Sequence, residues 1–212
     1  MSIRAVMMAV GLSVALSSVA YAQPGTVFVE GQGGAMIPVS EFRHEQHIGG
    51  TYSIAAGYEM VEFLDLMLQF THSFNDNVND HDRFNGPGFS GHSNETNQTF
   101  IVGLGPRINF LPSDYLVRPY GLFHVEWDHF AYFNQVTSNH RTLISDDDQD
   151  AFGVQAGLGI EATVFQLYER RADRYPLLAV TIGVNGSYHH AFQPSHPDKQ
   201  FVTTLGSVGV RF

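Results

Sequence analysis

The chain has 212 residues, of which 43% are hydrophobic, 15% are charged and none is Cys. A charged fraction this low, together with 13% aromatic residues, excludes an intrinsically disordered chain. The formal net charge of −10 at pH 7 argues against a nucleic-acid binder, because neutralising phosphates requires clustered Lys and Arg. Without Cys no disulfide can form, so stability has to come from other interactions.

The first predicted element in chain order is a secretory signal peptide over residues 1–22. Arg4 precedes an uncharged run from Ala5 to Val19, and Ala20-Tyr21-Ala22 provides an A-x-A cleavage site. The run is short for crossing about 30 Å of hydrocarbon, which disfavours the alternative of an uncleaved anchor. We therefore predict an exported domain over residues 23–212.

Residues 23–212 alternate between apolar residues and small or polar ones with a period of two. Phe152, Val154 and Ala156, for example, alternate with Gly153 and Gln155. Eight such segments can be placed, and each has roughly the ten residues that a tilted strand needs to cross a bilayer. The predicted strands are residues 25–37, 47–60, 63–74, 99–111, 116–133, 151–167, 177–191 and 201–212.

These segments predict an all-β fold, an eight-stranded antiparallel transmembrane up-and-down β-barrel whose apolar faces point outward to lipid. The opposite faces are rich in small residues and carry charges that would pair inside a narrow lumen. A soluble β-sandwich is the alternative, because alternation does not say which face is wet. The inward charged residues are predicted to be Glu30, Glu59, Asp65, Arg107, Arg118, Glu126, Glu161 and Arg211. Lumen ion pairing is assigned to Glu30, Arg107, Arg118, Glu126, Glu161 and Arg211, with Arg211 paired to Glu30 near the periplasmic end.

Aromatic residues mark both ends of the predicted strands, as expected for the two interfaces of a bilayer. One girdle comprises Phe110, Tyr115, Tyr120, Tyr168, Tyr175 and Phe212, and the other Tyr52, Phe70, Phe100, Trp127, Tyr132, Phe152, Tyr188 and Phe192. Turns near residues 61–62, 112–115 and 168–176 alternate with loops at 38–46, 75–98, 134–150 and 192–200. This alternation predicts periplasmic turns, extracellular loops and both chain ends on the periplasmic side.

The last predicted strand ends Gly206-Ser207-Val208-Gly209-Val210-Arg211-Phe212. Together with the signal peptide and the eight alternating segments, this ending resembles the small bacterial outer-membrane barrels of the OmpA-like and OmpX/Ail-like group. The resemblance implies a protein of the Gram-negative cell outer membrane, in contact with its lipid and lipopolysaccharide. It also implies that the barrel-assembly machinery reads Phe212 together with Val208 and Val210.

Because the barrel wall faces lipid and the lumen is packed, a function is expected in the surface loops, above all in loops 75–98 and 134–150. We predict a non-enzymatic protein without a cofactor, with a structural or surface-binding role carried by acidic, His-rich loops. The loops contain 11 acidic residues against 4 basic ones, which disfavours polyanionic ligands. The acidic residues are Glu41, Glu45, Asp76, Asp80, Asp82, Glu95, Asp146, Asp147, Asp148, Asp150 and Asp198, and the basic ones are Arg43, Arg83, Arg141 and Lys199.

Two weak metal signals occur in the same regions. All 11 His residues fall in predicted loops or in the outer halves of strands, which suggests a transition-metal site or a charge that appears at about pH 6. No H-x-H or H-x3-H spacing fixes a geometry for such a site. Asp146, Asp148 and Asp150 have the spacing with which a calcium loop begins, but Ala151 and Gly157 stand where Gly and Glu are expected. A solvated acidic loop is the alternative.

An enzymatic alternative rests on Ser187 and His189 of one strand and Glu126 and Asp128 of another, which are predicted to point inward at similar heights. Ser187 as nucleophile, His189 as base and Asp128 as the orienting carboxylate would suit a lipid A acyl hydrolase or transferase. The chain departs from the lipid A deacylase pattern H-x-S-N, because His92-Ser93-Asn94 lacks the intervening residue. A narrow pore is the second alternative, which a lumen filled by side chains disfavours.

Overall fold

The computed structural model describes residues 25–40, 46–76, 84–86, 89–112, 115–138, 141–167, 177–193 and 197–212. The predicted signal peptide of residues 1–22 lies outside the described residues. Among the described segments, no helix is long and apolar enough to cross a membrane. The strands are β1 (Val27–Val39), β2 (Gly49–Val61), β3 (Leu64–Asp76), β4 (Phe84–Gly86), β5 (Phe89–Asn109), β6 (Val117–Ser138), β7 (Arg141–Leu167), β8 (Leu178–Phe192) and β9 (Lys199–Arg211).

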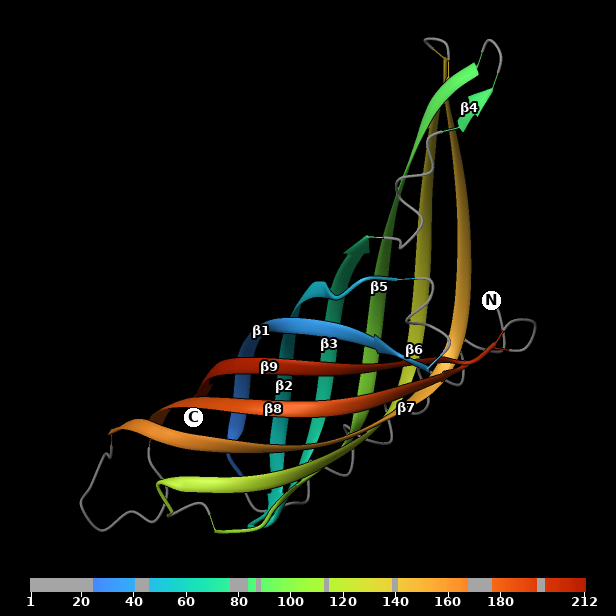
Figure 1. The fold of residues 1–212 in the computed structure, drawn as a ribbon. Coiled ribbons are helices and arrows are strands. Elements are labelled where there is room, and N and C mark those ends of the chain that lie inside the picture. The colour runs from blue at the N-terminus through green and yellow to red at the C-terminus, as the bar shows by residue number, and fades with distance from the viewer. Residues whose placement is uncertain are drawn as a thin grey trace, which may run out of the picture.

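Eight of these strands close into an antiparallel barrel (Figure 1). β3 pairs directly with β5, and β1 pairs with β9 from Phe28 and Arg211 to Val39 and Gln200. At this seam the backbones of Val27 and Phe212 exchange two hydrogen bonds of 2.9 Å. The predicted eight-stranded barrel is therefore confirmed, and β4 is a short additional strand that pairs with β5 outside the ring.

We call the two ends of the barrel the turn end and the loop end. The turn end contains the tight turn between β2 and β3 at Glu62 and Phe63, together with Gly25 and the C-terminal Phe212. The loop end contains the connection from β1 to β2 and the connection from β8 to β9. These names describe the structure and carry no assumption about which end faces the cell exterior.

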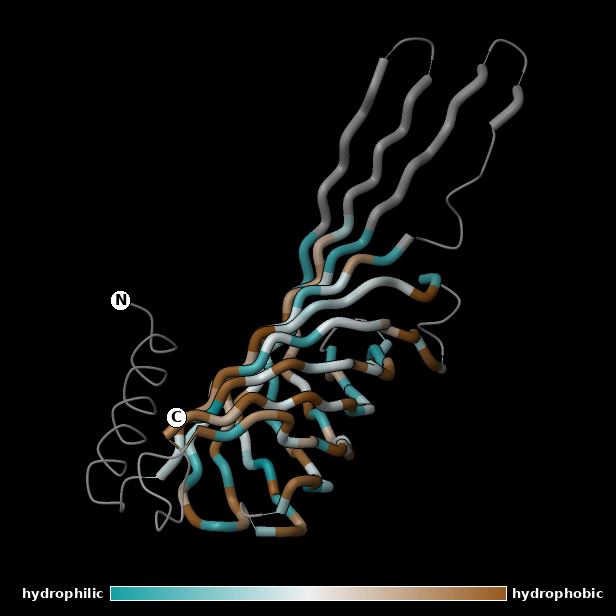
Figure 2. Tube along the Cα trace, turned by 90° about the vertical axis from the view of Figure 1, so that its left-hand side faces the viewer, coloured by the Kyte–Doolittle hydropathy of each residue, from teal (hydrophilic) through white to brown (hydrophobic). Residues whose placement is uncertain are grey.

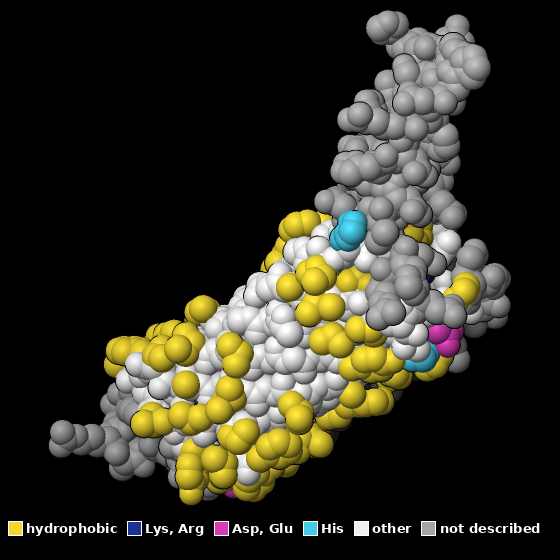
Figure 3. Space-filling model, viewed as in Figure 1, with side chains coloured by type: hydrophobic (Ala, Val, Ile, Leu, Met, Phe, Trp, Pro, Cys, Tyr) yellow, Lys and Arg dark blue, Asp and Glu magenta, His cyan; other side chains and the backbone are white. Residues whose placement is uncertain are grey.

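The barrel is apolar outside, as predicted, and its interior holds the predicted charges together with buried apolar clusters. Large hydrophobic side chains are exposed on all eight strands of the ring and together form an apolar belt. Figure 3 shows such side chains on one face of the barrel, and Figure 2 shows hydrophobic and hydrophilic residues along the strands. One example from each strand is Val29, Ile54, Leu68, Leu104, Val125, Leu158, Val184 and Val208. The eight charged residues predicted to point inward are all buried. Keeping this belt in water would cost about 25 cal/mol per Å2 of apolar surface, so the fold requires surrounding hydrocarbon.

Of the predicted girdle residues that the structure describes, two point inward instead, and Tyr168 and Tyr175 lie outside the described residues. Tyr120 is buried, and Tyr132 packs against the apolar cluster inside the barrel. Both occupy positions of β6 that alternate in phase with the buried Arg118 and Glu126, so they share the inward face. Their assignment from height along the strand alone was wrong, because strand parity decides which side a residue faces.

Three strands are longer than predicted and project beyond the loop end (Figure 1). β6 and β7 remain paired as far as Ser138 and Arg141, whereas β8 leaves β7 at Phe152 and β3 leaves β5 at Thr96. Much of the regions predicted as loops 75–98 and 134–150 is therefore strand. The prediction missed these extensions because a strand outside the bilayer has no face in hydrocarbon, so its sequence need not alternate.

We predict that Leu158→Arg destabilises the barrel by about 2 to 4 kcal/mol, because it places a charge near the middle of the lipid-facing belt. Leu158 is 67% exposed on β7. Ile48→Arg is a matched control, since Ile48 is 68% exposed in the connection at the loop end. The control should lose about 1 kcal/mol or less. Urea unfolding of the refolded protein in vesicles measures both, and equal losses would contradict the lipid-facing assignment.

Candidate functional sites in the lumen and at the loop end

Arg107 on β5 is the centre of an ion network in the lumen near the turn end. Its Nη1 lies 2.7 Å from Oε1 of Glu30 on β1, and its Nη2 lies 2.9 Å from Oε2 of Glu161 on β7. Its Nε lies 3.7 Å from Oδ2 of Asp65 on β3. All four side chains are buried. Since an unpaired buried charge costs several kcal/mol, these contacts allow the four charges to lie inside the barrel.

Glu161 also brings in the other two arginines of the lumen. Nη2 of Arg118 lies 2.9 Å from Oε1 of Glu161, and Nη2 of Arg211 lies 3.1 Å from the same oxygen. Nη2 of Arg211 also lies 4.0 Å from Oδ2 of Asp65. The predicted pair of Arg211 with Glu30 was therefore wrong. The reason is the register between β1 and β9, which places Arg211 opposite Phe28 and Glu30 opposite Gly209.

Two aromatic rings cover the Arg107 guanidinium. Its Cζ lies 3.8 Å from the ring centroid of Tyr120 and 5.4 Å from that of Phe28, which are distances of cation–π contacts. Tyr120 is paired across the sheet with Gly159, and Phe28 with Gly57. A Cβ at either glycine would overlap the facing ring. Glycine is therefore required at these two positions for the rings to lie flat over the neighbouring strand.

An apolar cluster fills the lumen at the opposite, loop end. Its buried members are Met36, Ile101, Phe130, Ala151, Ala191 and Phe201. Lys199 of β9 lies above it, with Nζ 4.1 Å from the ring centroid of Phe130 and 4.3 Å from that of Tyr132. The described lumen thus has an ion network near one end and an apolar plug near the other.

The structure does not assemble the predicted arrangement of Ser187, His189 and Asp128. His189 Nδ1 lies 3.0 Å from Oε2 of Glu126, and its Nε2 lies 3.0 Å from Oγ1 of Thr203. Oγ of Ser187 and both carboxylate oxygens of Asp128 are buried without a hydrogen-bond partner among the described residues. Thr203 rather than Ser187 reaches the imidazole because it lies on the neighbouring strand β9, whereas Ser187 is two residues away along β8.

Thr203, His189 and Glu126 therefore form a hydroxyl–imidazole–carboxylate relay. All three side chains are at most 3% exposed, and the Phe201 ring stacks on the imidazole with centroids 4.5 Å apart. The relay resembles a nucleophilic triad in connectivity, and it lies buried next to the apolar cluster through Phe201. Its two hydrogen bonds orient the imidazole, which is the role that such networks have inside narrow barrels.

The three aspartates of the proposed calcium spacing lie on strand β7. Alternate residues of a strand lie along a straight line on one face, whereas a calcium loop wraps its oxygen ligands around the ion. Asp150 instead lies 2.8 Å from Nδ1 of His129 on β6. Among the described residues, no three His, Asp or Glu side chains are grouped closely enough to hold a metal ion. The side chain of Asp146 lies outside the described ones.

The residues of the predicted assembly signal lie on the outward face of β9. Val208 is 60% and Phe212 57% exposed, and Val210 shares their face. The backbone of Phe212 is at the same time hydrogen-bonded to Val27 across the seam. These positions combine an accessible apolar side with a completed backbone pairing.

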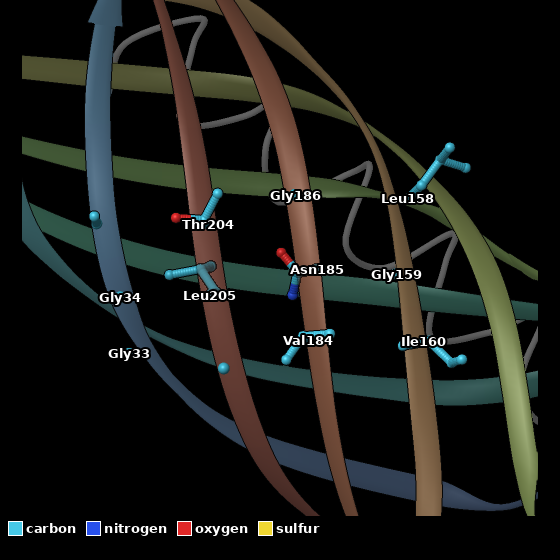
Figure 4. Close-up of a pocket in the computed structure, with 12 residues that line it drawn as sticks. Gly33, Gly34, Leu158, Gly159, Ile160, Val184, Asn185, Gly186, Thr204 and Leu205 are labelled. Atoms are coloured by element: carbon cyan, nitrogen blue, oxygen red, sulfur yellow. The ribbon is translucent and has the colours of Figure 1, made fainter.

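A groove of about 720 Å3 crosses the barrel wall over β1, β9, β8 and β7 (Figure 4). The groove forms because Gly33, Gly186 and Gly206 face outward and have no side chain to fill it. The side chains of Leu158, Ile160 and Val184 border it. A Cβ added at Gly33 would meet nothing within 4 Å. As the groove opens on the lipid-facing belt, lipid chains are sufficient to fill it.

Sequence reasoning missed a chain of stacked rings on the outer wall at the loop end. His72 of β3 stacks on Phe100 of β5 with ring centroids 4.3 Å apart. The hydroxyl oxygen of Tyr52 lies 2.8 Å from Nδ1 of His72. His129 of β6 stacks on Trp127 with centroids 5.8 Å apart. We call these rings, with Asp150 and the group around His190 described next, the rim collar.

His190 of β8 forms the second part of the rim collar. Its ring lies 4.5 Å from that of Phe192 and 6.5 Å from that of Tyr188. Its Nε2 lies 3.0 Å from Oδ2 of Asp198, and this hydrogen bond lowers the pKa of the Asp198 carboxyl, assisted by the backbone N–H of Gln193. A signal for the collar exists in the sequence, as Phe70-x-His72, Trp127-x-His129 and Tyr188-x-His190 repeat one pattern of an aromatic residue and a His two positions later.

The model of the outer membrane protein beta-barrel domain family matches residues 7–193. The chain belongs to this family. Membership, the closed barrel and its apolar belt place the protein in the cell outer membrane. A search of curated proteins found no match.

Solved structures with the same fold are also small outer-membrane barrels. OprG from Pseudomonas aeruginosa is 13% identical, with a TM-score of 0.52 over 90% of this chain and 96% of that chain. The attachment invasion locus protein Ail of Yersinia pestis is 13% identical, with a TM-score of 0.51 over 90% of this chain and 100% of that chain. Neisserial surface protein A is 17% identical, with a TM-score of 0.51 over 88% and 97%. The resemblance to the OmpX/Ail-like group is confirmed for the fold.

Replacing Arg107 with Met should destabilise the protein by about 3 to 5 kcal/mol, because Glu30 and Asp65 then stay buried without their cation. R107M combined with E30Q should lose less than the sum of the two single variants, by about 1 kcal/mol. Urea unfolding in vesicles gives all three values. Strictly additive losses would show that Arg107 and Glu30 do not interact.

Proposed function

We propose that the protein is a non-enzymatic surface-binding barrel whose loop end faces the cell exterior. Residues 89–95 of β5, 134–138 of β6 and 141–151 of β7 form the binding element, which we call the projecting sheet. The observation that carries the proposal is the continuation of these three strands past the apolar belt. Strands that project into water add nothing to the membrane span, so contact with another molecule is their most direct use.

The projecting sheet has an unpaired edge along β7. Pairing with β8 ends at Phe152, so residues 141–151 present backbone groups on this side without a partner among the described strands. On the opposite side, β4 covers the tip of β5 from Phe89 to Gly91. An exposed strand edge can accept an added strand, in which main-chain hydrogen bonds provide affinity.

The composition of the projecting sheet favours a basic partner. It contains the acidic residues Glu95, Asp146, Asp147, Asp148 and Asp150 and one basic residue, Arg141. We therefore propose that an extended segment rich in Lys or Arg binds along β7. Ail has been solved with the heparin analogue sucrose octasulfate. The acidic sheet of this chain argues against a ligand of that sulfated kind here.

The lumen argues against both alternatives to binding. A narrow pore would need a continuous water path, but apolar side chains fill the loop end and the Arg107 network fills the turn end. A lipid hydrolase would need an accessible nucleophile, whereas Ser187 is 2% exposed and His189 contacts Thr203 instead. We also propose that Val208, Val210 and Phe212 are read by the barrel-assembly machinery, since their side chains lie on the outward face.

Shortening the β6–β7 hairpin should abolish partner binding without unfolding the barrel. Replacing residues 136–143 by Asn-Gly joins Gln135 to Ile144, which are paired across the two strands, through a two-residue turn. The probe is a biotinylated peptide of alternating Lys and Thr. A peptide of the same length with alternating Glu and Thr is the negative control. Biolayer interferometry should show at least about a tenfold loss of affinity, equal to about 1.4 kcal/mol.

A second variant tests the acidic side chains of β7 separately from its open backbone edge. Changing Asp146, Asp147, Asp148 and Asp150 to Asn keeps the hairpin and should weaken binding in a manner that depends on salt. Both variants should keep the heat-modifiable gel migration of the folded barrel. Unchanged affinity of the shortened hairpin would refute the proposed binding element.

Planar bilayers that contain the purified protein should show no discrete conductance steps, because both ends of the lumen are filled. Single-channel recording in symmetric salt measures this directly. Reproducible open levels in the wild type would favour the narrow pore over the binding protein.

A further inference from the structure

The rim collar lies at the border between the apolar belt and the aqueous side of the loop end. On each of β3, β6 and β8 an outward aromatic residue is followed, two positions nearer the loop end on the same face, by a His. The pairs are Phe70 and His72, Trp127 and His129, and Tyr188 and His190. On β7 the exposed Phe152 is followed in that direction by Asp150. Figure 3 shows histidine side chains where the belt ends near the projecting strands. Aromatic girdles lie at headgroup level, so these polar groups face the lipid headgroups.

We propose that the rim collar binds phosphomonoester groups of lipid headgroups through the imidazoles of His129 and His190. Each imidazole has one ring nitrogen on a carboxylate, and among the described residues no hydrogen bond is seen at its other nitrogen. His129 uses Nδ1 toward Asp150, at 2.8 Å, and His190 uses Nε2 toward Asp198, at 3.0 Å. This orients Nε2–H of His129 and Nδ1–H of His190 as donors for a phosphate oxygen.

The carboxylates orient the two imidazoles toward an outside acceptor. When such an imidazole is protonated, its second N–H donates a charge-assisted hydrogen bond to a phosphate oxygen. Asp150 and Asp198 are the charged groups facing the two rings. Phe100 and Trp127 pack around His129, and Tyr188 and Phe192 around His190. Lys199, which follows Asp198, extends instead over the rings of Phe130 and Tyr132.

Protonation of His therefore controls the charge of this border. With neutral imidazoles, Asp150 and Asp198 leave it negative and repel phosphates, whereas with imidazolium each pair is neutral and offers a donor. Headgroup phosphate and proton then bind together. Contact with phosphorylated lipid should strengthen as the pH falls through the range in which His titrates.

The chain contains a built-in reporter for this binding, because Trp127 is its one Trp and stacks on His129. A protonated imidazole stacked on an indole quenches its emission, so a pH titration of Trp emission follows His129. The full refolded chain is titrated in phosphatidylcholine vesicles with and without phosphatidic acid, which carries a phosphomonoester. We expect phosphatidic acid to raise the pH midpoint by at least about half a unit, a roughly threefold gain in proton affinity.

Matched controls separate binding from general surface charge. Phosphatidylserine vesicles of equal surface charge should give a clearly smaller shift, and His129→Gln should abolish the pH response. His47→Gln is the control substitution, since His47 is exposed at the loop end outside the rim collar, and it should change nothing. Asp150→Asn should reduce the shift that phosphatidic acid produces, because it removes the carboxylate that orients the imidazole of His129.

Three results would overturn the proposal. One is the absence of any shift with phosphatidic acid, and another is an equal shift with phosphatidylserine, which would leave only a surface potential. The third is an equal shift when inorganic phosphate is added to phosphatidylcholine vesicles, which would assign the site to soluble phosphate. Asp150 belongs to both the rim collar and the projecting sheet, but the titrations of the wild type and of His129→Gln do not depend on the sheet, so its proposed binding function can fail or hold independently.

Discussion

Pairing of backbone groups in hydrocarbon is the constraint on which this structure depends. An unpaired N–H or C=O inside a bilayer costs several kcal/mol, so a sheet that crosses the membrane cannot leave an edge. β1 and β9 satisfy this requirement by pairing along their length, down to the two hydrogen bonds between Val27 and Phe212. Closure with eight strands in turn makes the lumen too narrow to stay empty, and so determines what the interior residues have to do.

The narrow lumen explains why inward charges and rings are so closely packed. Arg107 is acceptable there because Glu30 and Glu161 neutralise it and Tyr120 and Phe28 cover it. The rings in turn need Gly159 and Gly57 beneath them. The chain has no Cys, so this network, the loop-end plug and the lipid around the belt replace the covalent links that many exported proteins use.

Where the wall leaves the bilayer, the same constraint is relaxed. Water can satisfy an open edge, so residues 141 to 151 of β7, which stay paired with β6, can extend past β8 without a partner on that side among the described strands. The rim collar lies between these two regimes, with aromatic rings toward the belt and imidazoles and carboxylates toward water. The physical properties of the barrel therefore change with height, from apolar belt to titratable collar to acidic projecting sheet.

Alternation of side chains was sufficient to predict the eight strands, their outward faces and the eight buried charges, because a bilayer outside and a narrow lumen inside leave a strand residue only two environments. It could not predict that Arg211 binds Glu161, that His189 binds Thr203, or that Tyr120 turns inward over Arg107. Those contacts join residues of different strands, and the register and shear of the closed barrel decide which of them meet. The extensions of β5 to β7 also lay beyond sequence reasoning, since outside the membrane only pairing with neighbouring strands, and no difference between two solvents, holds a strand in place.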